Sequence, residues 1–212
     1  MGWTCVVPVK AGPERKSRLA PTLDARQRLA LSNQLYRHVV QCISNSGIAE
    51  AIIALSPALP EADVPVQLWV QEDRDLNVEL GRVRDATAGP LMVINADLPL
   101  LQPHDVAALA EAAEMQGCAV APDRHQSGTN AVALIPDVPF AFSFGPDSLR
   151  LHLASADRGA WAVGSIGFAY DVDTWADIEA ILALGMPLPP DVARLFPSAG
   201  DKGARAALVV GD

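Results

Sequence analysis

Short apolar segments alternate with longer amphipathic ones through most of this chain. The apolar segments fall at residues 3–9, 51–55, 66–70, 91–95, 118–122 and 131–135, and stretches of helical period separate most of them. Strands joined by helices run parallel to one another, and the connecting helices cover both faces of the sheet. We therefore expect an α/β fold with a mainly parallel sheet and helices on both faces. Since no internal repeat or long linker interrupts the pattern, residues 1–212 are expected to form a single domain.

The helical stretches carry their own boundary signals. Asp24 is a good N-cap for a helix that ends near residues 45–47. Apolar residues recur along this helix at intervals of three and four, and the stripe consists of Leu31, Leu35, Val39 and Cys42. Further helices are expected over residues 76–88, 103–116, 146–156 and 174–184. One or two strands are expected within 161–171, whereas the tail after Pro189 stays unassigned.

The composition is that of a globular enzyme domain. Half of the 212 residues are hydrophobic and 19% are charged, which is too apolar for a disordered chain and sufficient for one buried core. No apolar run approaches the roughly 18 residues that a membrane span requires, and the N-terminus has no signal-peptide pattern. Cys5, Cys42 and Cys118 are widely spaced, which is typical of buried, reduced thiols. We expect a cytoplasmic protein.

The charges are distributed unevenly along the chain. A net charge of −9 argues against nucleic-acid binding, which requires a basic surface. Seven of the sixteen lysines and arginines nevertheless fall between residues 10 and 37. Such a cluster can bind an anionic ligand within an otherwise acidic protein. Arg26, Arg28 and Arg37 can equally form the solvated face of a helix, so the loop cations that precede them are the stronger candidates.

Two strand ends carry residues that suit a nucleoside triphosphate. Lys10, Lys16 and Arg18 follow the first strand, and Asp97 follows the strand at 91–95. Open α/β sheets bind ligands at the carboxyl ends of their strands, where cations can contact phosphates and a carboxylate can hold their metal ion. We therefore expect a nucleotidyltransferase. Asp97 taken alone could also be a loop-capping residue.

A second acidic site lies in the segment YDVDT. Asp171 and Asp173 are two residues apart, so on an extended segment both side chains face the same way. Adjacent carboxylates repel each other unless a cation lies between them, which makes the pair a candidate metal site. Asp173 can alternatively be the N-cap of the helix that starts near Thr174.

Six segments stand in the order seen in one enzyme family, namely PVKAGPERKSRLAP, DLNVELG, NADLPLL, SGTNAVAL, FGPDSLRLHL and YDVDTWADI. Over residues 4–184 the chain resembles the guanylyltransferases of coenzyme F-420 biosynthesis, the CofC/FbiD-like family. The resemblance implies a single-domain, Rossmann-like fold of the nucleotide-diphospho-sugar transferase (MobA-like) type. It also implies transfer of GMP from GTP to 2-phospho-L-lactate, phosphoenolpyruvate or 3-phospho-D-glycerate, with release of pyrophosphate. Which of the three acids is the acceptor stays open.

The same resemblance assigns roles to individual residues. The catalytic residues that it implies are Lys10, Lys16 and Asp97, and the implied ligands of one or two Mg²⁺ ions are Asp97, Asp171 and Asp173. The implied GTP-binding set consists of Lys10, Lys16, Ser17, Arg18 and Asn77.

The resemblance also implies a pocket for the phospho-acid. It consists of Thr129, Asn130, Gly145 and Ser148. Gly145 would allow close approach of the backbone, and Ser148 stands at the expected start of a helix, where free amides suit an anion. Both local sequences, SGTN and GPDS, are otherwise ordinary turn and cap sequences. His152 is expected either near the acceptor or packed at the surface.

The expected chemistry needs no general base. The attacking group is a phosphate that is mostly dianionic at neutral pH, so catalysis must come from charge neutralisation and positioning. Two alternatives are a molybdenum-cofactor or sugar-phosphate nucleotidyltransferase, whose opening glycine-rich loop is missing here, and a non-catalytic nucleotide-binding regulator. The expected partners are GTP, the phospho-acid and a downstream transferase that takes the product, with a homodimer left open. Neither nucleic acid nor a membrane is expected as a partner.

Overall fold

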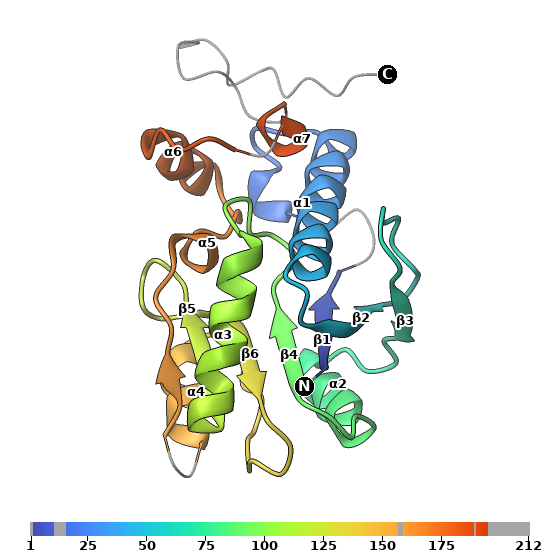
Figure 1. Cartoon of the computed structure of the whole chain (residues 1–212). Coiled ribbons are helices and arrows are strands. Elements are labelled where there is room, and N and C mark those ends of the chain that lie inside the picture. The colour runs from blue at the N-terminus through green and yellow to red at the C-terminus, as the bar shows by residue number, and fades with distance from the viewer. Residues whose placement is uncertain (1, 11–15, 157–158, 189, 195–212) are drawn as a thin grey trace.

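A computed structural model describes residues 2–10, 16–156, 159–188 and 190–194. Its centre is a seven-stranded sheet in the order β3-β2-β1-β4-β6-β5-β7 (Figure 1). The strands are β1 (Trp3–Pro8), β2 (Ala49–Ser56), β3 (Gln67–Val70), β4 (Leu91–Ile94), β5 (Cys118–Pro122), β6 (Thr129–Leu134) and β7 (Trp161–Ala162). Only β6 pairs antiparallel with its neighbours β4 and β5, so the expected mainly parallel sheet is confirmed.

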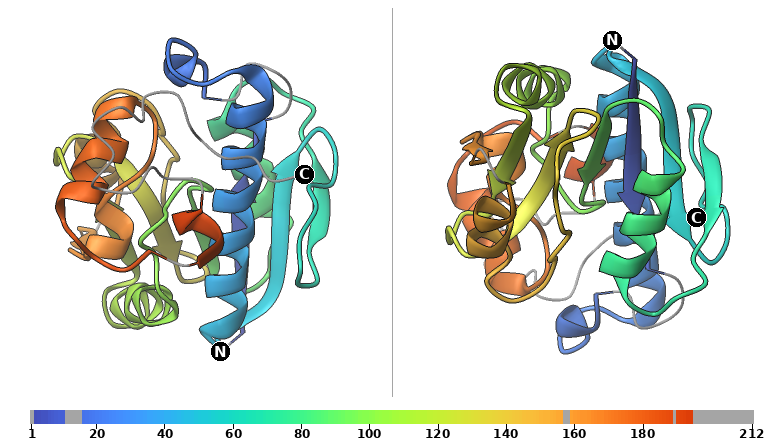
Figure 2. Two further views of the ribbon diagram at one scale, coloured as in Figure 1. Left: turned by 90° about the horizontal axis from the view of Figure 1, so that it is seen from above. Right: turned by 90° about the horizontal axis from the view of Figure 1, so that it is seen from below.

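Helices cover both faces of the sheet, as expected (Figures 1 and 2). The longer ones are α1 (Ala25–Asn45), α2 (Leu76–Asp85), α3 (Pro103–Gln116), α4 (Ser148–Ser155) and α6 (Trp175–Ala183). The short ones are the 3-10 helix η1 (Ser17–Leu19), α5 (Ile166–Ala169) and α7 (Pro190–Ala193). Helices α1 and α3 pack on one face, and α2 and α4 pack on the other. Among the described residues, no helix is long and apolar enough to cross a membrane.

Alternation along the strands divides the core into two layers. Cys5 and Val7 of β1 face α1 and α3, whereas Val6 between them faces α2. The central strands repeat this pattern, because successive side chains of a strand point to opposite faces. Both faces are buried, so the strands read as continuous apolar runs in the sequence. The three cysteines are free and buried in these layers, which confirms the expectation for their thiols.

The predicted boundary of the first helix is confirmed. The Asp24 carboxylate accepts a hydrogen bond from the Gln27 amide at 2.8 Å, and the Gln27 side chain accepts one from the Asp24 amide at 2.9 Å. This capping box satisfies amides that a helix start leaves without partners. The predicted apolar stripe of α1 is buried along its whole length.

The prediction of one or two strands within 161–171 is confirmed for one short strand, β7, and the rest of the range is not a strand. β7 comprises residues 161–162, the Val163 amide donates one further hydrogen bond to the Val120 carbonyl of β5 at 2.8 Å, and residues 166–169 form α5 instead. The Ser165 hydroxyl accepts a hydrogen bond from the Phe168 amide at 3.2 Å and so caps the helix. Gly167 then packs directly against the Asp105 carboxylate at the start of α3, where a side chain would not fit.

A third apolar cluster lies beyond the carboxyl ends of the parallel strands. It joins η1, the first half of α1 and α6, and consists of Leu19, Leu23, Leu31, Leu35, Leu100, Val172, Ile178 and Ile181. Leu19 is the buried residue of η1. The cluster therefore holds η1 and α6 over the sheet edge that carries the predicted site.

We predict opposite effects of alanine at two glycines. A Cβ atom at Gly167 would overlap the Asp105 carboxylate and lie 3.1 Å from the Leu101 Cα, so Gly167→Ala should lower the free energy of unfolding by about 2–4 kcal/mol. Gly81, inside α2, has open space at its Cβ position, so Gly81→Ala should raise it by about 0.5–1 kcal/mol. Urea unfolding of both variants measures the difference. Equal effects of the two substitutions would contradict the packing described for Gly167.

Candidate active site

The predicted site lies where the strand order reverses. β1 is flanked by β2 on one side and β4 on the other, so the chain connections leave in opposite directions from this point. Such a switch point is the usual ligand site of an open α/β sheet. Because β6 is antiparallel, its first residues lie at the same edge, and the Asn95 amide after β4 donates to the Asn130 carbonyl at 2.9 Å.

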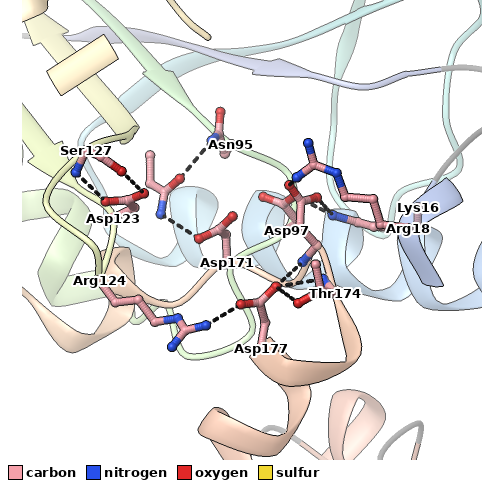
Figure 3. A network of polar contacts seen from close by, with 12 residues as sticks. Lys16, Arg18, Asn95, Asp97, Asp123, Arg124, Ser127, Asp171, Thr174 and Asp177 are labelled. Atoms are coloured by element: carbon pink, nitrogen blue, oxygen red, sulfur yellow. Dashed lines mark hydrogen bonds and ion pairs between the residues drawn. The ribbon is translucent and has the colours of Figure 1, made fainter. Parts of the chain in front are cut away.

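Lys16 reaches two carboxylates at this edge (Figure 3). Its Nζ atom forms ion pairs with Asp97 and, at 3.2 Å, with Asp173. The guanidinium of Arg18 lies 3.6 Å from the Asp173 carboxylate. Burial acts to lower the pKa of Lys16, but Asp97 and Asp173 outweigh it and raise that pKa, so Lys16 is charged at neutral pH.

The three predicted metal ligands converge. Each of Asp97, Asp171 and Asp173 offers a carboxylate oxygen within 4.8 Å of the others. Asp171 and Asp173 lie on an irregular connection between α5 and α6, with the buried Val172 between them. The Val172 amide donates to the Asp97 carbonyl at 3.1 Å, which ties the connection to the end of β4. The N-cap of α6 is Thr174 rather than Asp173, so that alternative is wrong.

The electrostatics of the cluster favour a bound cation. Burial raises the pKa of Asp171 to about 6, with further contributions from the Asp97 and Asp173 charges. The Oδ1 atom of Asp97 is buried and has no hydrogen-bond partner among the described residues. Carboxylate oxygens are the ligands that Mg²⁺ prefers in proteins. The donor set and the unpaired oxygen therefore fit the expected metal ion.

Asn130 contacts the carboxylate cluster directly. Its Nδ2 atom donates to the Phe168 carbonyl at 2.8 Å and to Asp171 at 3.3 Å. Its Oδ1 atom accepts from the Asn95 side chain at 3.0 Å. The side chain is buried, with 3% of the residue exposed, and these three bonds fix its orientation. Asn130 therefore orients Asp171; its contact with an acceptor stays a prediction.

Thr129, the residue before Asn130 in β6, forms a buried pair with Ser148. The Thr129 amide donates to the Ser148 hydroxyl at 2.9 Å, and the Thr129 hydroxyl lies 3.0 Å from Nδ1 of His152. His152 is fully buried, and its Nε2 accepts from the Ser143 amide at 2.9 Å, so the expectation of packing at the surface is wrong, whereas a place near the acceptor stays a prediction. Burial lowers the pKa of His152 to about 4, which keeps the ring neutral.

The start of α4 offers fewer free amides than expected. The Ser148 amide donates to the Gly145 carbonyl at 3.2 Å, and the Leu149 amide donates to the Ser127 carbonyl at 3.1 Å. Gly145 is exposed and has a φ of 132°, a conformation that only glycine adopts readily. The role of Gly145 and Ser148 in acceptor binding stays a prediction.

The predicted GTP contacts are placed around the same edge. Lys10 is exposed at the end of β1, and Ser17 and Arg18 are exposed on η1. The Asn77 side chain is bound to the Phe144 backbone, accepting from its amide at 2.7 Å and donating to its carbonyl at 3.2 Å. The loop between Lys10 and Lys16, including Arg15, and the tail after residue 194 lie outside the described residues.

Two further residues support the site and were not predicted. Asp177 accepts hydrogen bonds from the amides of Asp173 and Thr174, at 3.1 and 2.6 Å. Arg124, from the loop between β5 and β6, donates to Asp177 at 2.5 Å. The spacing of Thr174 and Asp177 is a capping-box pattern that the sequence does contain. Nothing local marks Arg124, because its partner lies 53 residues further along the chain.

Lys16 pairs with Asp97 and Asp173, two of the carboxylates that would bind the metal ion. Lys16→Met should therefore tighten the binding of Mn²⁺ to the nucleotide-free protein several-fold, because no ammonium group then competes for Asp97 and Asp173. Electron paramagnetic resonance of free Mn²⁺ measures the affinity. The exposed Arg18, changed to Met, provides the control and should have a smaller effect. Weaker Mn²⁺ binding in Lys16→Met would contradict competition between the two cations.

Asp171 should make stability depend on pH. Its folded-state pKa, about 6, lies above the ordinary 3.8, so the stability contributed by its proton is complete below about pH 4 and lost above about pH 6. In metal-free buffer, the stability of Asp171→Asn relative to the wild type should rise by roughly 1–2 kcal/mol between pH 5 and pH 7.5. Urea unfolding at both pH values measures this difference. The contribution of His152 to the pH dependence cancels in the comparison, because both proteins contain it. A difference independent of pH would contradict the raised pKa.

Comparison with known proteins identifies the family. The family model described as "Guanylyl transferase CofC like" matches residues 3–186. A phosphoenolpyruvate guanylyltransferase of Rubrobacter xylanophilus is 39% identical over 191 residues, which cover 85% of this chain and 93% of that protein. A second protein of that name, from Sphaerobacter thermophilus, is 35% identical over 188 residues, or 83% and 90% of the two chains.

Solved structures identify the fold. A protein of Desulfovibrio desulfuricans G20, described as a nucleotide-diphospho-sugar transferase, superposes with a TM-score of 0.65 at 14% identity, covering 98% of this chain and 94% of that chain. A 4-diphosphocytidyl-2C-methyl-D-erythritol synthase of Anaerococcus prevotii superposes with a TM-score of 0.56 at 10% identity, covering 87% and 99%. The fold is therefore of the nucleotide-diphospho-sugar transferase type, and the chain belongs to the CofC-like guanylyl transferase family.

Proposed function

We propose that this guanylyltransferase transfers GMP from GTP to phosphoenolpyruvate. The observation that carries the proposal is the convergence of Lys16 with three carboxylates at the sheet's switch point. This arrangement supports binding of a metal-chelated triphosphate. The lysine can contact the phosphate oxygens, and the carboxylates can bind the metal ion that the phosphates carry. The choice among the three candidate acids follows the name shared by the relatives at 33–39% identity.

The proposed reaction is an in-line displacement at phosphorus. A phosphate oxygen of the acceptor forms a bond to the α-phosphorus of GTP, and the bond from that phosphorus to the bridging oxygen breaks as pyrophosphate leaves. The attacking phosphate is already deprotonated, so no proton has to be removed. The buried, neutral His152 is therefore not needed as a base, and its hydrogen bonds give it a structural task. The main barrier is repulsion between the two anions.

The residues at the edge lower that barrier by supplying charge and orientation. Lys16 and Arg18 would provide positive charge for the phosphates, and the exposed Lys10 after β1 would add a third cation. Asp97, Asp171 and Asp173 would hold Mg²⁺, which when bound neutralises phosphate charge and orients the triphosphate. Asn130 keeps one carboxylate, that of Asp171, in a fixed orientation.

The two alternative functions differ in their expected behaviour. A non-catalytic regulator would bind GTP without turnover, and the clustering of the three carboxylates supports the enzyme instead. Molybdenum-cofactor or sugar-phosphate activity would require another acceptor on the same fold. Passage of the product to a downstream transferase in coenzyme F-420 biosynthesis, the use of Mg²⁺ and a homodimer all stay predictions.

Pyrophosphate release tests the function directly. The wild-type protein should release pyrophosphate from GTP and Mg²⁺ when phosphoenolpyruvate is present, and much less with ATP or CTP in place of GTP. Phospholactate and 3-phosphoglycerate, supplied separately, test the choice of acceptor. Asp97→Asn should reduce release at least 100-fold, because it removes a charged ligand at the metal site. Its thermal midpoint serves as the control for folding.

Release with 2-phospho-L-lactate or 3-phospho-D-glycerate alone would move the acceptor to that acid and leave the chemistry standing. No release with any of the three, from a protein that binds GTP, would favour the regulator. Full activity of Asp97→Asn would contradict the placement of the metal site.

A further inference from the structure

The segment that carries two of the three carboxylates belongs to neither helix nor sheet. Asp171 and Asp173 lie between α5 and α6, in a segment that does not pair with any strand of the sheet. Carboxylates must be held in a narrow range of positions to bind Mg²⁺, which demands near-ideal octahedral geometry. Contacts from elsewhere in the chain must therefore set the position of this segment.

The Asp177 carboxylate fixes the segment at its second end. Its Oδ2 atom accepts three hydrogen bonds: from the Asp173 amide at 3.1 Å, from the Thr174 amide at 2.6 Å and from the Thr174 hydroxyl at 2.8 Å. The first of these bonds holds the backbone of a candidate metal ligand. Asp177 thus completes the capping box of α6 with the N-cap Thr174 (Figure 3), and it also holds the backbone of Asp173.

Arg124 holds the other oxygen of that carboxylate. Its guanidinium donates to Oδ1 of Asp177 at 2.5 Å, and the two side chains are 24% and 12% exposed. A charge-assisted pair that is mostly shielded from water is stronger than a pair on the surface. The Arg124 amide also donates to the Ala169 carbonyl at 2.7 Å, and the guanidinium lies 5.9 Å from the centre of the Tyr170 ring. One residue therefore contacts both ends of the segment.

Arg124 acts on the cluster at one remove. In Figure 3 its side chain points to Asp177, on the opposite side of the acidic cluster from Lys16. Within the described part of the chain, no ion pair joins Arg124 to Asp97, Asp171 or Asp173. Its task is therefore different from that of Lys16, which pairs with two of those carboxylates.

We propose that Arg124 is a positioning residue of the transferase site. Through Asp177 it fixes the place of Asp173, and it thereby sets the affinity of the three-carboxylate cluster for a divalent cation. The inference rests on the metal-binding role proposed above for Asp97, Asp171 and Asp173. It concerns a residue that, within the described part of the chain, forms no hydrogen bond or ion pair with the metal ligands' carboxylates or with the predicted phosphate contacts.

Mn²⁺ binding to the nucleotide-free protein tests the proposal. Arg124→Gln should weaken the affinity for Mn²⁺, measured by electron paramagnetic resonance of the free ion, by about 10-fold or more, as is typical when a partner of a metal ligand is removed. In pyrophosphate release, the Mn²⁺ concentration for half-maximal rate should rise similarly, while the rate at saturating Mn²⁺ changes little. A purely structural role would instead lower the thermal midpoint without this dependence on metal.

Arg37 provides a matched control. Its side chain is 27% exposed and pairs with Glu61 at 3.1 Å and Asp63 at 3.3 Å, in the connection between β2 and β3. Arg37→Gln therefore removes a comparably buried arginine that does not hold the metal segment. Its Mn²⁺ affinity should stay within about twofold of the wild type, whatever its thermal midpoint.

A double-mutant cycle separates action through Asp177 from any other effect of Arg124. Asp177→Asn keeps an oxygen that can cap α6 but loses the charged pair, so its Mn²⁺ affinity should also fall. Combining it with Arg124→Gln should cost little more than either change alone, because both remove the same interaction. Arg124→Lys keeps the positive charge and should lose an intermediate amount of Mn²⁺ affinity. If Arg124→Gln does not fold, Arg124→Lys still tests the proposal.

The outcomes are distinct for the two proposals. Unchanged Mn²⁺ affinity in folded Arg124→Gln or Arg124→Lys protein, an equal loss in Arg37→Gln, or additive losses in the cycle would overturn the positioning role. Wild-type protein that binds no Mn²⁺ would overturn the metal site and with it the positioning role, and pyrophosphate release would still decide the proposed function. Wild-type protein that binds Mn²⁺ but releases no pyrophosphate would overturn the proposed function alone, and the affinity measurement would still decide the role of Arg124.

Discussion

Repulsion among three carboxylates is the constraint that shapes this end of the molecule. Asp97, Asp171 and Asp173 lie within 4.8 Å of one another, and charges of one sign at that distance in a partly buried site destabilise the fold. The nucleotide-free protein offsets the repulsion with Lys16, and protonation of Asp171 offsets it further at acid pH. Because a bound cation relieves this repulsion, the repulsion that destabilises the empty site increases the affinity of the site for cations. Burial, together with the charges of Asp97 and Asp173, thus raises the pKa of Asp171, and the same cluster of charges favours the expected metal.

The fold meets this constraint with parts that are far apart in the sequence. β4 delivers Asp97 to the sheet edge, η1 delivers Lys16, and the antiparallel β6 brings Asn130 to the same place. The apolar cluster around Leu19 holds η1 and α6 over the edge, so the charged groups do not have to hold themselves together. Figure 1 shows α6 above the carboxyl ends of the parallel strands. Burial of apolar side chains stabilises the fold and thereby offsets the repulsion among the carboxylates of the site.

The sequence predicted the parts of the molecule that local patterns specify. The alternation of apolar segments predicted the sheet, and the Asp24 cap predicted the start of α1. The pattern failed at residues 166–169, where a Ser165 cap and the contact of Gly167 with Asp105 produce a helix; that contact depends on α3, which is distant in sequence. The grouping of Asp97, Asp171 and Asp173 followed from the family resemblance; only Asp97 follows a strand end, because Asp171 and Asp173 lie on the connection between α5 and α6. Three features could not be predicted from local sequence patterns: the pairing of Arg124 with Asp177, the burial of His152 and the orientation of Asn130. Each of them depends on contacts between separate elements.

The location of the metal ion is the most direct test of this account. Crystals grown with Mn²⁺ and GTP, and without an acceptor, would be measured for anomalous scattering at a wavelength where manganese scatters strongly. The account predicts an anomalous peak bound by oxygens of Asp97, Asp171 and Asp173, with Nζ of Lys16 displaced from the carboxylates toward the phosphates of GTP. A peak bound only by phosphate oxygens, with Lys16 still paired to Asp97 and Asp173, would contradict it.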